Sequence, residues 1–486
     1  MDTSALHKTA CVQKRRSLIV SVRQIVSGVV NQFREELIGL VETALAEPMT
    51  PANFTRMVED LKTALATVGR RAFIDLVAAS EEHGAMVEHG GKSHRFKQIS
   101  SKEWLTPFGC VQIDRRYFQP DAGGEGLAPL DQRCGMSDRY MTPDVEEAVA
   151  FASADLSPSA TRCLLEKLLP QAPSDKAIRR LIADVGGWAE DAWDEIEYRV
   201  AEEVPMPEGD TLVVSVDGVN VPMRQAGVKT GRPAERPGVG KGSLTKTVWR
   251  EAGVGTISIY RAGDGEERRP ERLATKYLAR MPEAGMKTLF AQQGWAVWEL
   301  TKERQFQEIV VLCDGKPSLW TTIEEDPLYK GATLILDFYH VAEHLSKAAE
   351  AIFGKKKRAA IRWYEKYKAL LREDRGGLDS LLRSLRYYRR SLRVGTERHQ
   401  VVDRVIRYFG RNRDRMKYAE FRARGLPIGS GVVEAACKTI VGARLKKSGM
   451  RWSRDGAQHV LNLRTRARSG EWASFWNGYL ELRCAA

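Results

Sequence analysis

Apolar residues recur at helical spacing through the N-terminal part of the chain. Leu18 and Val22 begin one series, whose further members stand three or four residues apart, and a second series starts at Pro51. These patterns predict two amphipathic helices, one over residues 15–47 and one from Pro51 onward. Long paired helices of this kind usually serve structure or join subunits, so the region 1–90 is assigned no chemistry.

The pattern changes to alternation in residues 91–140. Two alternating runs, His94–Trp104 and Cys110–Phe118, flank a turn sequence at 106–109 that contains Pro and Gly. This arrangement predicts a small β-hairpin. Three residues of the second run lie on alternating positions: Val111, Ile113 and Tyr117.

Helical spacing returns in residues 141–204. Three short helices are predicted there: Pro143–Ala154, Ser159–Leu169 and Ser174–Val185. Ser157 and Ser174 stand where N-caps belong, and an acidic helix, Trp188–Glu203, follows. A three-helix unit of this size fits a DNA-binding helix-turn-helix, although a plain helical connector explains the pattern equally well. Three cations of the last short helix would face DNA: Lys176, Arg179 and Arg180.

Two short apolar runs further along the chain each end in Asp-Gly. Leu212–Val216 leads into Asp217, and Ile309–Cys313 leads into Asp314. Such runs predict buried strands that open into turns, where a rigid sheet presents a carboxylate to solvent. A single Asp-Gly after a strand is most often only a turn. The repetition of the design is what points to an acidic site.

The elements between residues 205 and 345 follow an informative order. After the Asp217 strand we predict strands at Thr245–Arg250 and Gly255–Tyr260, helices at Glu271–Arg280 and Met286–Glu303, the Asp314 strand, a helix from Pro317, a strand at Ala332–Asp337 and a helix from His340. This order is the plan of an α/β ribonuclease H-like domain. Its first and fourth strands are neighbours, so Asp217 and Asp314 should meet at one end of the sheet.

The positive charge of the protein is concentrated in one segment. The 486 residues carry a net charge of +13, and Lys355–Arg424 alone holds 23 Lys or Arg against 8 Asp or Glu. Cations interleaved with aromatic residues suit phosphate contact and base stacking, and we expect Arg389 and Arg390 to bind DNA. Each aromatic residue taken singly is more simply a core residue of a helical bundle. The aromatic residues concerned are Trp363, Tyr364, Tyr367, Tyr387 and Tyr388.

A third acid stands at the head of the C-terminal region. Gly429-Ser430-Gly431 opens a predicted helix, with Ser430 as its cap and Glu434 in its first turns. Residues 435–468 then carry nine Lys or Arg and one acid, Asp455. Glu434 could be a capping carboxylate, but metal binding better explains an acid isolated among cations. Three carboxylates suit two Mg²⁺ ions, which can activate an attacking oxygen and stabilise a leaving one.

These patterns together predict an α/β ribonuclease H-like catalytic core with an all-α insertion, behind a mainly helical N-terminal region that contains a small β-hairpin. The first part of the core spans 205–345, the basic helical insertion 346–425, and the C-terminal part with Glu434 and a basic tail 426–486.

Other classes of protein are disfavoured by the cysteine and hydropathy patterns. The seven cysteines are scattered and form no Cys-x-x-Cys pair, which argues against a zinc ribbon or disulfide framework and for a reducing cytoplasm. The apolar run Leu18–Val30 is interrupted by polar residues, so neither a signal peptide nor a membrane span is expected.

Five motifs give the chain a family resemblance: Ser215–Val219, Leu312–Gly315, Leu336–His344, Ile428–Lys438 and Arg444–Trp452. With them, residues 100–470 resemble bacterial insertion-sequence transposases of the Asp-Asp-Glu type, in particular the Kra-type family (ISKra), which is distantly related to Mutator-like transposases. Relatives often carry a cysteine pair after the equivalent of Tyr117. The chain has none in 119–124, so no zinc knuckle is expected.

The resemblance implies roles for individual residues. Asp217, Asp314 and Glu434 would be the catalytic and metal-binding triad. Asp337 rivals Asp314 because it also ends a strand, but with His340 it looks like the Asp-x-x-His signature of Mutator-like enzymes, which implies an auxiliary role. The tail would supply DNA contacts: Lys438, Arg444, Lys446, Lys447, Arg451 and Trp452.

The implied function is that of a DNA transposase. It would bind the terminal inverted repeats of a bacterial insertion sequence as a homodimer or higher oligomer, cut double-stranded DNA with two Mg²⁺ ions, for which Mn²⁺ could substitute, and join the ends to target DNA. It would be cytoplasmic, associated with the nucleoid and not with membrane. Two alternatives stand beside it: a DNA-binding regulator or domesticated transposase that no longer cuts, and a structure-selective nuclease of the same fold.

Overall fold

The structure is a computed structural model that describes residues 27–485 except 32, 47, 82, 121–122, 225–247, 262–269 and 303. The chain divides into two compact units. One comprises Met1–Val185 with Trp476–Ala486, and the other comprises Gly186–Phe475. In the described part of the chain, no helix has both the length and the apolar content that crossing a bilayer requires.

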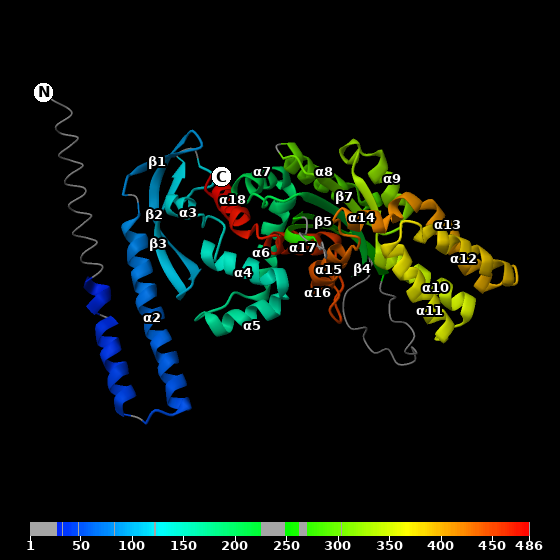
Figure 1. The fold of residues 1–486 in the computed structure, drawn as a ribbon. Coiled ribbons are helices and arrows are strands. Elements are labelled where there is room, and N and C mark those ends of the chain that lie inside the picture. Colours follow the sequence, from blue (N-terminus) through cyan, green and yellow to red (C-terminus); the bar gives the residue numbers. More distant parts are fainter. Residues whose placement is uncertain are drawn as a thin grey trace, which may run out of the picture. The chain divides into compact units, whose positions relative to one another are not determined.

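The first unit begins with two helices. Residues 27–31 and 33–46 are helical, and α2 spans Pro51–Ala79 (Figure 1). The Thr50 hydroxyl caps α2 by accepting from the Asn53 amide at 3.2 Å, which is why the helix starts at Pro51. The rest of the predicted first helix, residues 15–26, 32 and 47, lies outside the described residues.

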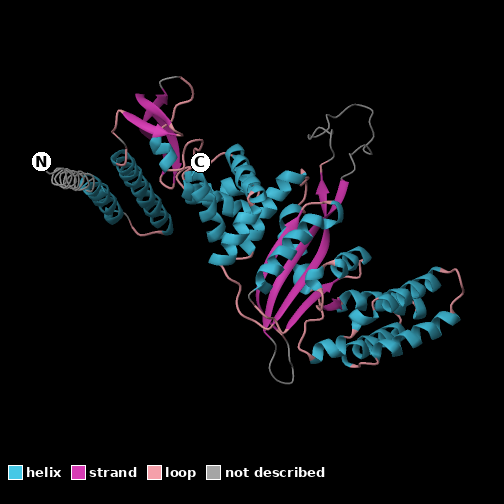
Figure 2. Cartoon of the chain, turned by 90° about the horizontal axis from the view of Figure 1, so that it is seen from above, coloured by secondary structure: helices cyan, strands magenta, loops and turns pink. Residues whose placement is uncertain are grey.

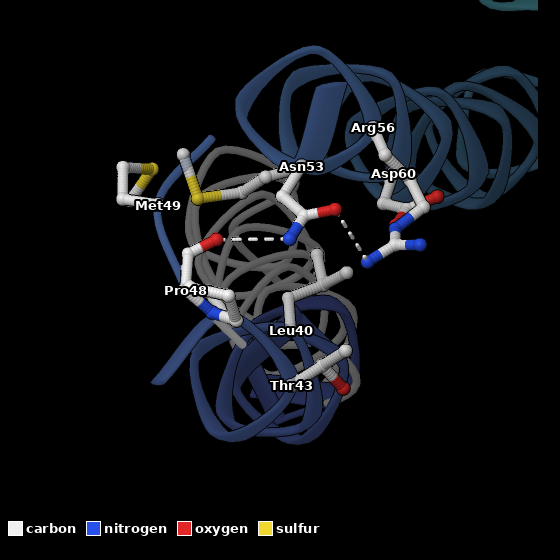
Figure 3. A pocket seen from close by; sticks show the side chains of 9 residues that line it. Leu40, Thr43, Pro48, Met49, Asn53, Arg56 and Asp60 are labelled. Atoms are coloured by element: carbon white, nitrogen blue, oxygen red, sulfur yellow. Dashed lines mark hydrogen bonds between the residues drawn. The ribbon is translucent and has the colours of Figure 1, made fainter. Parts of the chain in front are cut away.

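A shallow hollow lies where the first helix turns into α2 (Figure 3). Asn53 organises it, since its side-chain amide donates to the Pro48 carbonyl at 2.8 Å and its amide oxygen accepts from Arg56 at 3.4 Å. Apolar side chains such as Leu40 and Met57 form much of the lining. These contacts fix the turn between two helices, in keeping with a structural role.

The predicted hairpin is present. Strands β1 (Met86–His89), β2 (Lys92–Thr106) and β3 (Gly109–Pro120) form an antiparallel sheet, with Thr106 opposite Gly109 across the turn. Val111 and Ile113 are buried and Tyr117 is partly buried. Phe118 is also buried, and its backbone pairs with Leu127 beyond β3. Strand β2 carries a bulge between Phe96 and Gln98.

A short helix α3 (Pro129–Arg133) and four longer ones follow: α4 (Pro143–Asp155), α5 (Pro158–Leu168), α6 (Asp175–Asp191) and α7 (Trp193–Glu203). The predicted caps are confirmed, since Ser157 accepts from Ala160 N and Ser174 accepts from Ala177 N. Helix α6 continues beyond its predicted end, through Gly186. A Cβ at Gly186 would lie 2.4 Å from the Cβ of His459, so this glycine permits close packing rather than ending the helix.

The second unit is built on a five-stranded sheet in the order β6-β5-β4-β7-β8 (Figures 1 and 2). Its strands are β4 (Thr211–Met223), β5 (Val248–Arg261), β6 (Glu271–Arg280), β7 (Glu308–Cys313) and β8 (Thr333–Leu336). The β4–β5 and β5–β6 pairs are antiparallel, whereas β4–β7 and β7–β8 are parallel. Helices α8 (Lys287–Lys302), α9 (Pro317–Glu325) and α10 (Phe338–Phe353) connect and cover the strands.

The structure contradicts two predictions for this unit, one of a helix and one of a pair of strands. Glu271–Arg280 is strand β6, not a helix, because pairing along β5 outweighs the helix propensity of its Leu, Ala, Glu and Arg residues. The two strands predicted at Thr245–Arg250 and Gly255–Tyr260 are, where described, a single strand, β5. Gly253 does not break it: a Cβ there would lie 2.8 Å from Leu289 Cδ2, so this glycine lets α8 approach the sheet.

The remaining helices belong to the second unit, except that α18 from Trp476 onward belongs to the first. The basic region folds as α11 (Arg358–Glu373), α12 (Gly377–Ser391), α13 (Glu397–Arg411) and α14 (Tyr418–Ala423), whose buried residues join the core of the sheet. The C-terminal part contains α15 (Gly431–Ala436), a π-helical segment (Cys437–Gly442), α16 (Ala443–Leu445), α17 (Arg454–Arg468) and α18 (Trp472–Ala485). Three short 3₁₀ turns lie between elements: Ala284–Met286, Pro327–Tyr329 and Arg413–Met416.

Candidate functional site

Asp217 and Asp314 stand at the same level of two paired strands. Val214 of β4 pairs in parallel register with Val311 of β7, and each aspartate follows its member of this pair by three residues. Both side chains are partly buried. The sheet therefore brings together two acids that are 97 positions apart in the sequence.

Each of these carboxylates is oriented by a backbone amide close to it. Asp217 Oδ1 accepts from Gly218 N at 2.7 Å, and Asp314 Oδ1 accepts from Lys316 N at 3.0 Å. The ammonium of Lys316 forms an ion pair with Glu251 of β5 at 2.6 Å. Asp314 follows the end of β7, as predicted, whereas Asp217 lies inside β4, which continues along β5 to Met223 instead of ending in the predicted turn. Both carboxylates leave oxygen lone pairs for a further partner.

The pKa of Asp217 is raised in the folded protein. Burial raises the pKa of Asp217, and the negative charge of Asp314 raises it further, against the opposing effects of the Gly218 amide, the Cys437 thiol and His340. A divalent cation bound between the two carboxylates would offset the repulsion between their negative charges. The pair therefore fits a hard metal ion bound through oxygen.

Asp337 is committed to a different network. Only 1% of it is exposed. Its Oδ1 accepts from Tyr339 N at 2.8 Å, which caps α10, and its Oδ2 accepts from the Ser430 hydroxyl and from His340 Nδ1, the latter at 3.0 Å. Burial raises the pKa of Asp337, but these hydrogen bonds outweigh it and the pKa is lowered. Through these hydrogen bonds Asp337 connects the start of α10 with the segment that precedes α15.

Ser430 is the N-cap residue of α15, as predicted, but its hydroxyl accepts no cap hydrogen bond from the helix. The hydroxyl instead donates to the buried carboxylate of Asp337.

His340 is a cation next to the acids. Its hydrogen bond to Asp337 raises the pKa of His340 to about 9, with the charges of Asp337 and Asp314 contributing, so the imidazole is protonated at neutral pH. Its side chain is 38% exposed. His340 can therefore present positive charge at the edge of the acidic pair.

A pH titration tests this assignment. Because the folded-state pKa of His340 is raised, its ion pair stabilises the protein below about pH 6.5 and is lost as the pH rises through about 9. Unfolding measured between pH 7 and 10 should show a larger loss of stability in the wild type than in His340→Gln. Equal losses in the two proteins would contradict the ion pair.

Glu434 lies on α15, which packs against β4 and β5. Its side chain is 48% exposed, and its carboxylate pairs with Lys438 Nζ at 2.6 Å. One turn further on, Cys437 Sγ lies 3.6 Å from Asp217 Oδ2. The helix thus carries Glu434 to the strand that holds Asp217, while the carboxylate itself is paired with a lysine.

No group of three or more His, Cys, Asp or Glu within the described residues is arranged to hold a metal ion. Asp217 and Asp314 fit such an ion by charge and by donor type. The Glu434 carboxylate is paired with Lys438.

The predicted DNA contacts of the tail fall into two groups. Lys438, Lys446, Lys447 and Arg451 are exposed. Arg444 is 1% exposed, and its guanidinium lies 5.1 Å from the centroid of the Trp452 ring. The Trp452 indole donates to the Leu445 carbonyl at 3.0 Å, and its backbone pairs with Pro222 at the end of β4 and with Arg224 just after it. In this arrangement Arg444 and Trp452 pack the tail against the core, and a phosphate contact from Arg444 would require it to leave that place.

The aromatic residues of the basic region also divide. Trp363 and Tyr367 are buried in the core, and Tyr364 and Tyr388 are partly buried against it. Tyr387 is 69% exposed, between the exposed cations of α12. The exposed ring of Tyr387 is therefore accessible for stacking on a base.

Two features of the site escaped the sequence analysis. Cys437 contacts Asp217, and its only sequence signal was its spacing of three residues from Glu434. Gly315 makes room for Tyr408 of α13, whose hydroxyl would lie 2.1 Å from a Cβ at that position. The glycine after Asp314 therefore serves close packing of the basic helices against the site.

No protein-family model matches the chain, and no curated protein matches its sequence. Among solved structures it is similar to the Drosophila P element transposase strand transfer complex, at 11% sequence identity over 72% of this chain and 83% of that chain, with a TM-score of 0.24. A TM-score this low does not establish a shared fold.

Proposed function

We propose that the second unit is a ribonuclease H-like domain and that the protein is a DNA transposase of a bacterial insertion sequence. The observation that carries the proposal is the pairing of β4 with β7, which sets Asp217 and Asp314 at one level of the sheet. The strand order and directions support it, since two antiparallel pairs precede two parallel ones.

Asp217, Asp314 and Glu434 would hold two Mg²⁺ ions, for which Mn²⁺ could substitute. When bound, the ions would activate an attacking water or 3′-hydroxyl and stabilise the leaving oxygen. The chain's own residues prepare the place. Backbone amides orient both aspartates, Asp337 fixes the approach to α15, and His340 offers a positive charge to a phosphate.

The basic helices and tail would hold the DNA backbone, and the exposed cations of α6, Lys176, Arg179 and Arg180, would contribute to recognition of the ends. Binding of this kind weakens steeply with salt, because each neutralised phosphate releases counterions.

Arg390 gives a direct test of the DNA surface. It is exposed on α12, whereas its neighbour Arg389 pairs with Asp403 at 2.8 Å. Arg390→Ala should weaken binding on all sequences and reduce the slope of log affinity against log salt by about one. Arg389→Ala, the matched control, should change the slope less. Fluorescence anisotropy at several salt concentrations measures both, and an unchanged slope in Arg390→Ala would remove α12 from the DNA surface.

Incubation with DNA from both sides of the coding region, with and without Mg²⁺, tests the function. The proposal expects Mg²⁺-dependent nicks at an inverted repeat and joined products. Nicking without preference for the ends would instead indicate a structure-selective nuclease.

A second candidate is a DNA-binding protein that does not cut. The pairing of Glu434 with Lys438 favours it, because this pair leaves the third acid occupied. Tight, sequence-preferring binding to end DNA with no Mg²⁺-dependent nicking would decide for it.

A further inference from the structure

We infer that Cys437 is a positioning residue: its thiol holds the Asp217 carboxylate in place and fixes the register of the helix that carries Glu434. This inference rests on the proposed function, since it concerns the same acids. It assigns Cys437 no contact with substrate.

The first step concerns the Asp217 carboxylate. Gly218 N donates to Oδ1 at 2.7 Å, and Cys437 Sγ lies 3.6 Å from Oδ2 as a weak donor. The terminal torsion of an aspartate is broad, so a single hydrogen bond leaves the carboxylate plane free to turn. Contacts to both oxygens define the plane.

The second step concerns the rigidity of the thiol. Cys437 is 6% exposed, and its neighbours Ala436, Ile440 and Val441 are all buried. The side chain is thus fixed by packing on its own helix. A fixed donor can orient the group that it contacts.

The third step concerns register. Glu434 and Cys437 are three residues apart, so they lie on one face of the helix. A slip of one helical turn, about 5.4 Å, would remove the thiol from Asp217 and carry Glu434 away with it. The contact between Cys437 and Asp217 therefore couples the positions of the first and third acids.

The fourth step concerns the local helix. Cys437 begins the π-helical segment Cys437–Gly442. A π-turn adds a residue to the helical repeat and shifts the face presented after it. This offset lets Cys437 point at β4 while Arg444 and Leu445 remain buried further along. The helix therefore departs from α-helical geometry at the residue that contacts Asp217.

The choice of a thiol also has a reason. A lysine at this position would pair with Asp217 and compete with a cation for it. An uncharged, weak donor at 3.6 Å orients the carboxylate. Because the hydrogen bond is weak, little energy is lost if Asp217 Oδ2 binds a cation instead. Hydrogen-bonding partners behind metal-binding carboxylates typically change metal affinity 10- to 100-fold when removed, by order of magnitude.

The test compares three variants of the full chain. Cys437→Ala removes the donor, Cys437→Ser keeps one, and Val441→Ala removes buried apolar volume from the same segment while leaving the thiol in place. Mn²⁺ binding to the protein without DNA is measured by electron paramagnetic resonance, alongside the Mg²⁺ dependence of end cleavage and the unfolding temperature.

The expected result is specific to the donor. Cys437→Ala should weaken Mn²⁺ binding about tenfold and raise the Mg²⁺ concentration needed for half-maximal cleavage by a similar factor. Cys437→Ser should restore both to within about threefold of the wild type, since a hydroxyl also donates. Val441→Ala should unfold at a lower temperature and keep the wild-type Mn²⁺ affinity.

Three outcomes would overturn the inference. These are unchanged Mn²⁺ affinity in Cys437→Ala, failure of Cys437→Ser to rescue, and an equal loss of affinity in Val441→Ala. Should Cys437→Ala fail to fold, the serine variant decides by its own affinity. A wild type that binds Mn²⁺ but cuts no end DNA overturns the proposed function and leaves the inference standing if the variants differ as described.

Discussion

Replacing Asp217 or Asp314 by alanine is expected to slow cleavage of end DNA by about 1000-fold or more. The reason is that metal-ion catalysis supplies several kcal/mol of transition-state stabilisation, and each ~1.4 kcal/mol is a factor of ten in rate. Binding of end DNA should stay within about twofold, because the phosphate contacts come from cations elsewhere. Single-turnover nicking and fluorescence anisotropy measure the two quantities.

Asp414→Ala is the matched control. Asp414 belongs to the same unit, and its side chain is 88% exposed and pairs with Lys417 at 3.0 Å. Its loss should leave the nicking rate unchanged, since exposed ion pairs contribute little. Full activity in either Asp217→Ala or Asp314→Ala would refute the site.

Removing the charge of Asp217 is expected to leave the protein as stable or more stable, although it removes activity. The pKa of Asp217 is raised in the folded protein, so its charged form is disfavoured by folding and costs stability above that pKa. Asp217→Asn should therefore unfold at the wild-type temperature or a higher one when no metal is added. Added Mg²⁺ should stabilise the wild type and not the variant, which thermal unfolding would show.

The second large effect is expected at Glu197 of α7. Glu197 accepts ion pairs from Lys276 at 2.8 Å and from Arg466 at 2.6 Å, and both cations also pair with Glu471. Glu197 is 1% exposed. Glu197→Ala leaves two buried cations to share one carboxylate, so it should lower the free energy of unfolding by about 3–5 kcal/mol.

Glu203→Ala provides the comparison on the same helix, α7. Glu203 pairs with Arg199 at 3.2 Å, and its side chain is 42% exposed. Urea unfolding should place this variant within about 1 kcal/mol of the wild type. A Glu197→Ala protein as stable as Glu203→Ala would show that the buried quartet of Glu197, Lys276, Arg466 and Glu471 does not hold α7, β6 and α17 together.

Local signals in the sequence were enough to locate the apolar runs that lead into the two aspartates and several helix starts. The runs before Asp217 and Asp314 are strands, buried except for the partly buried Ile309, and such runs are visible without tertiary information. The turn predicted after Asp217 is absent because β4 continues along β5 to Met223. Ser157 and Ser174 cap helices because an N-cap depends on the next three residues only.

Features decided by distant residues could not be predicted in this way. Strand β6 has a helix-forming composition and is a strand because β5 pairs with it. The hydroxyl of Ser430 bonds to Asp337, which is 93 positions away. Arg444 looked like a surface cation among others, yet it is buried beside Trp452. In each case a tertiary partner outweighs the local preference.

Cys437 illustrates the same limit within the site. Its neighbours in sequence, Ala436 and Lys438, give no hint of a contact with Asp217. The contact exists because the π-helical segment and the packing of α15 on β4 set the thiol there. A motif can identify the acids, but the groups that orient them are found only in three dimensions.

The most direct test is anomalous diffraction from crystals of the protein with end DNA and Mn²⁺. The account predicts Mn²⁺ ligated by Asp217, Asp314 and Glu434, at distances on the order of 2 Å, with Lys438 released from Glu434. Mn²⁺ bound elsewhere, or ligated by Asp337 while Asp314 and Glu434 stand aside, would contradict it.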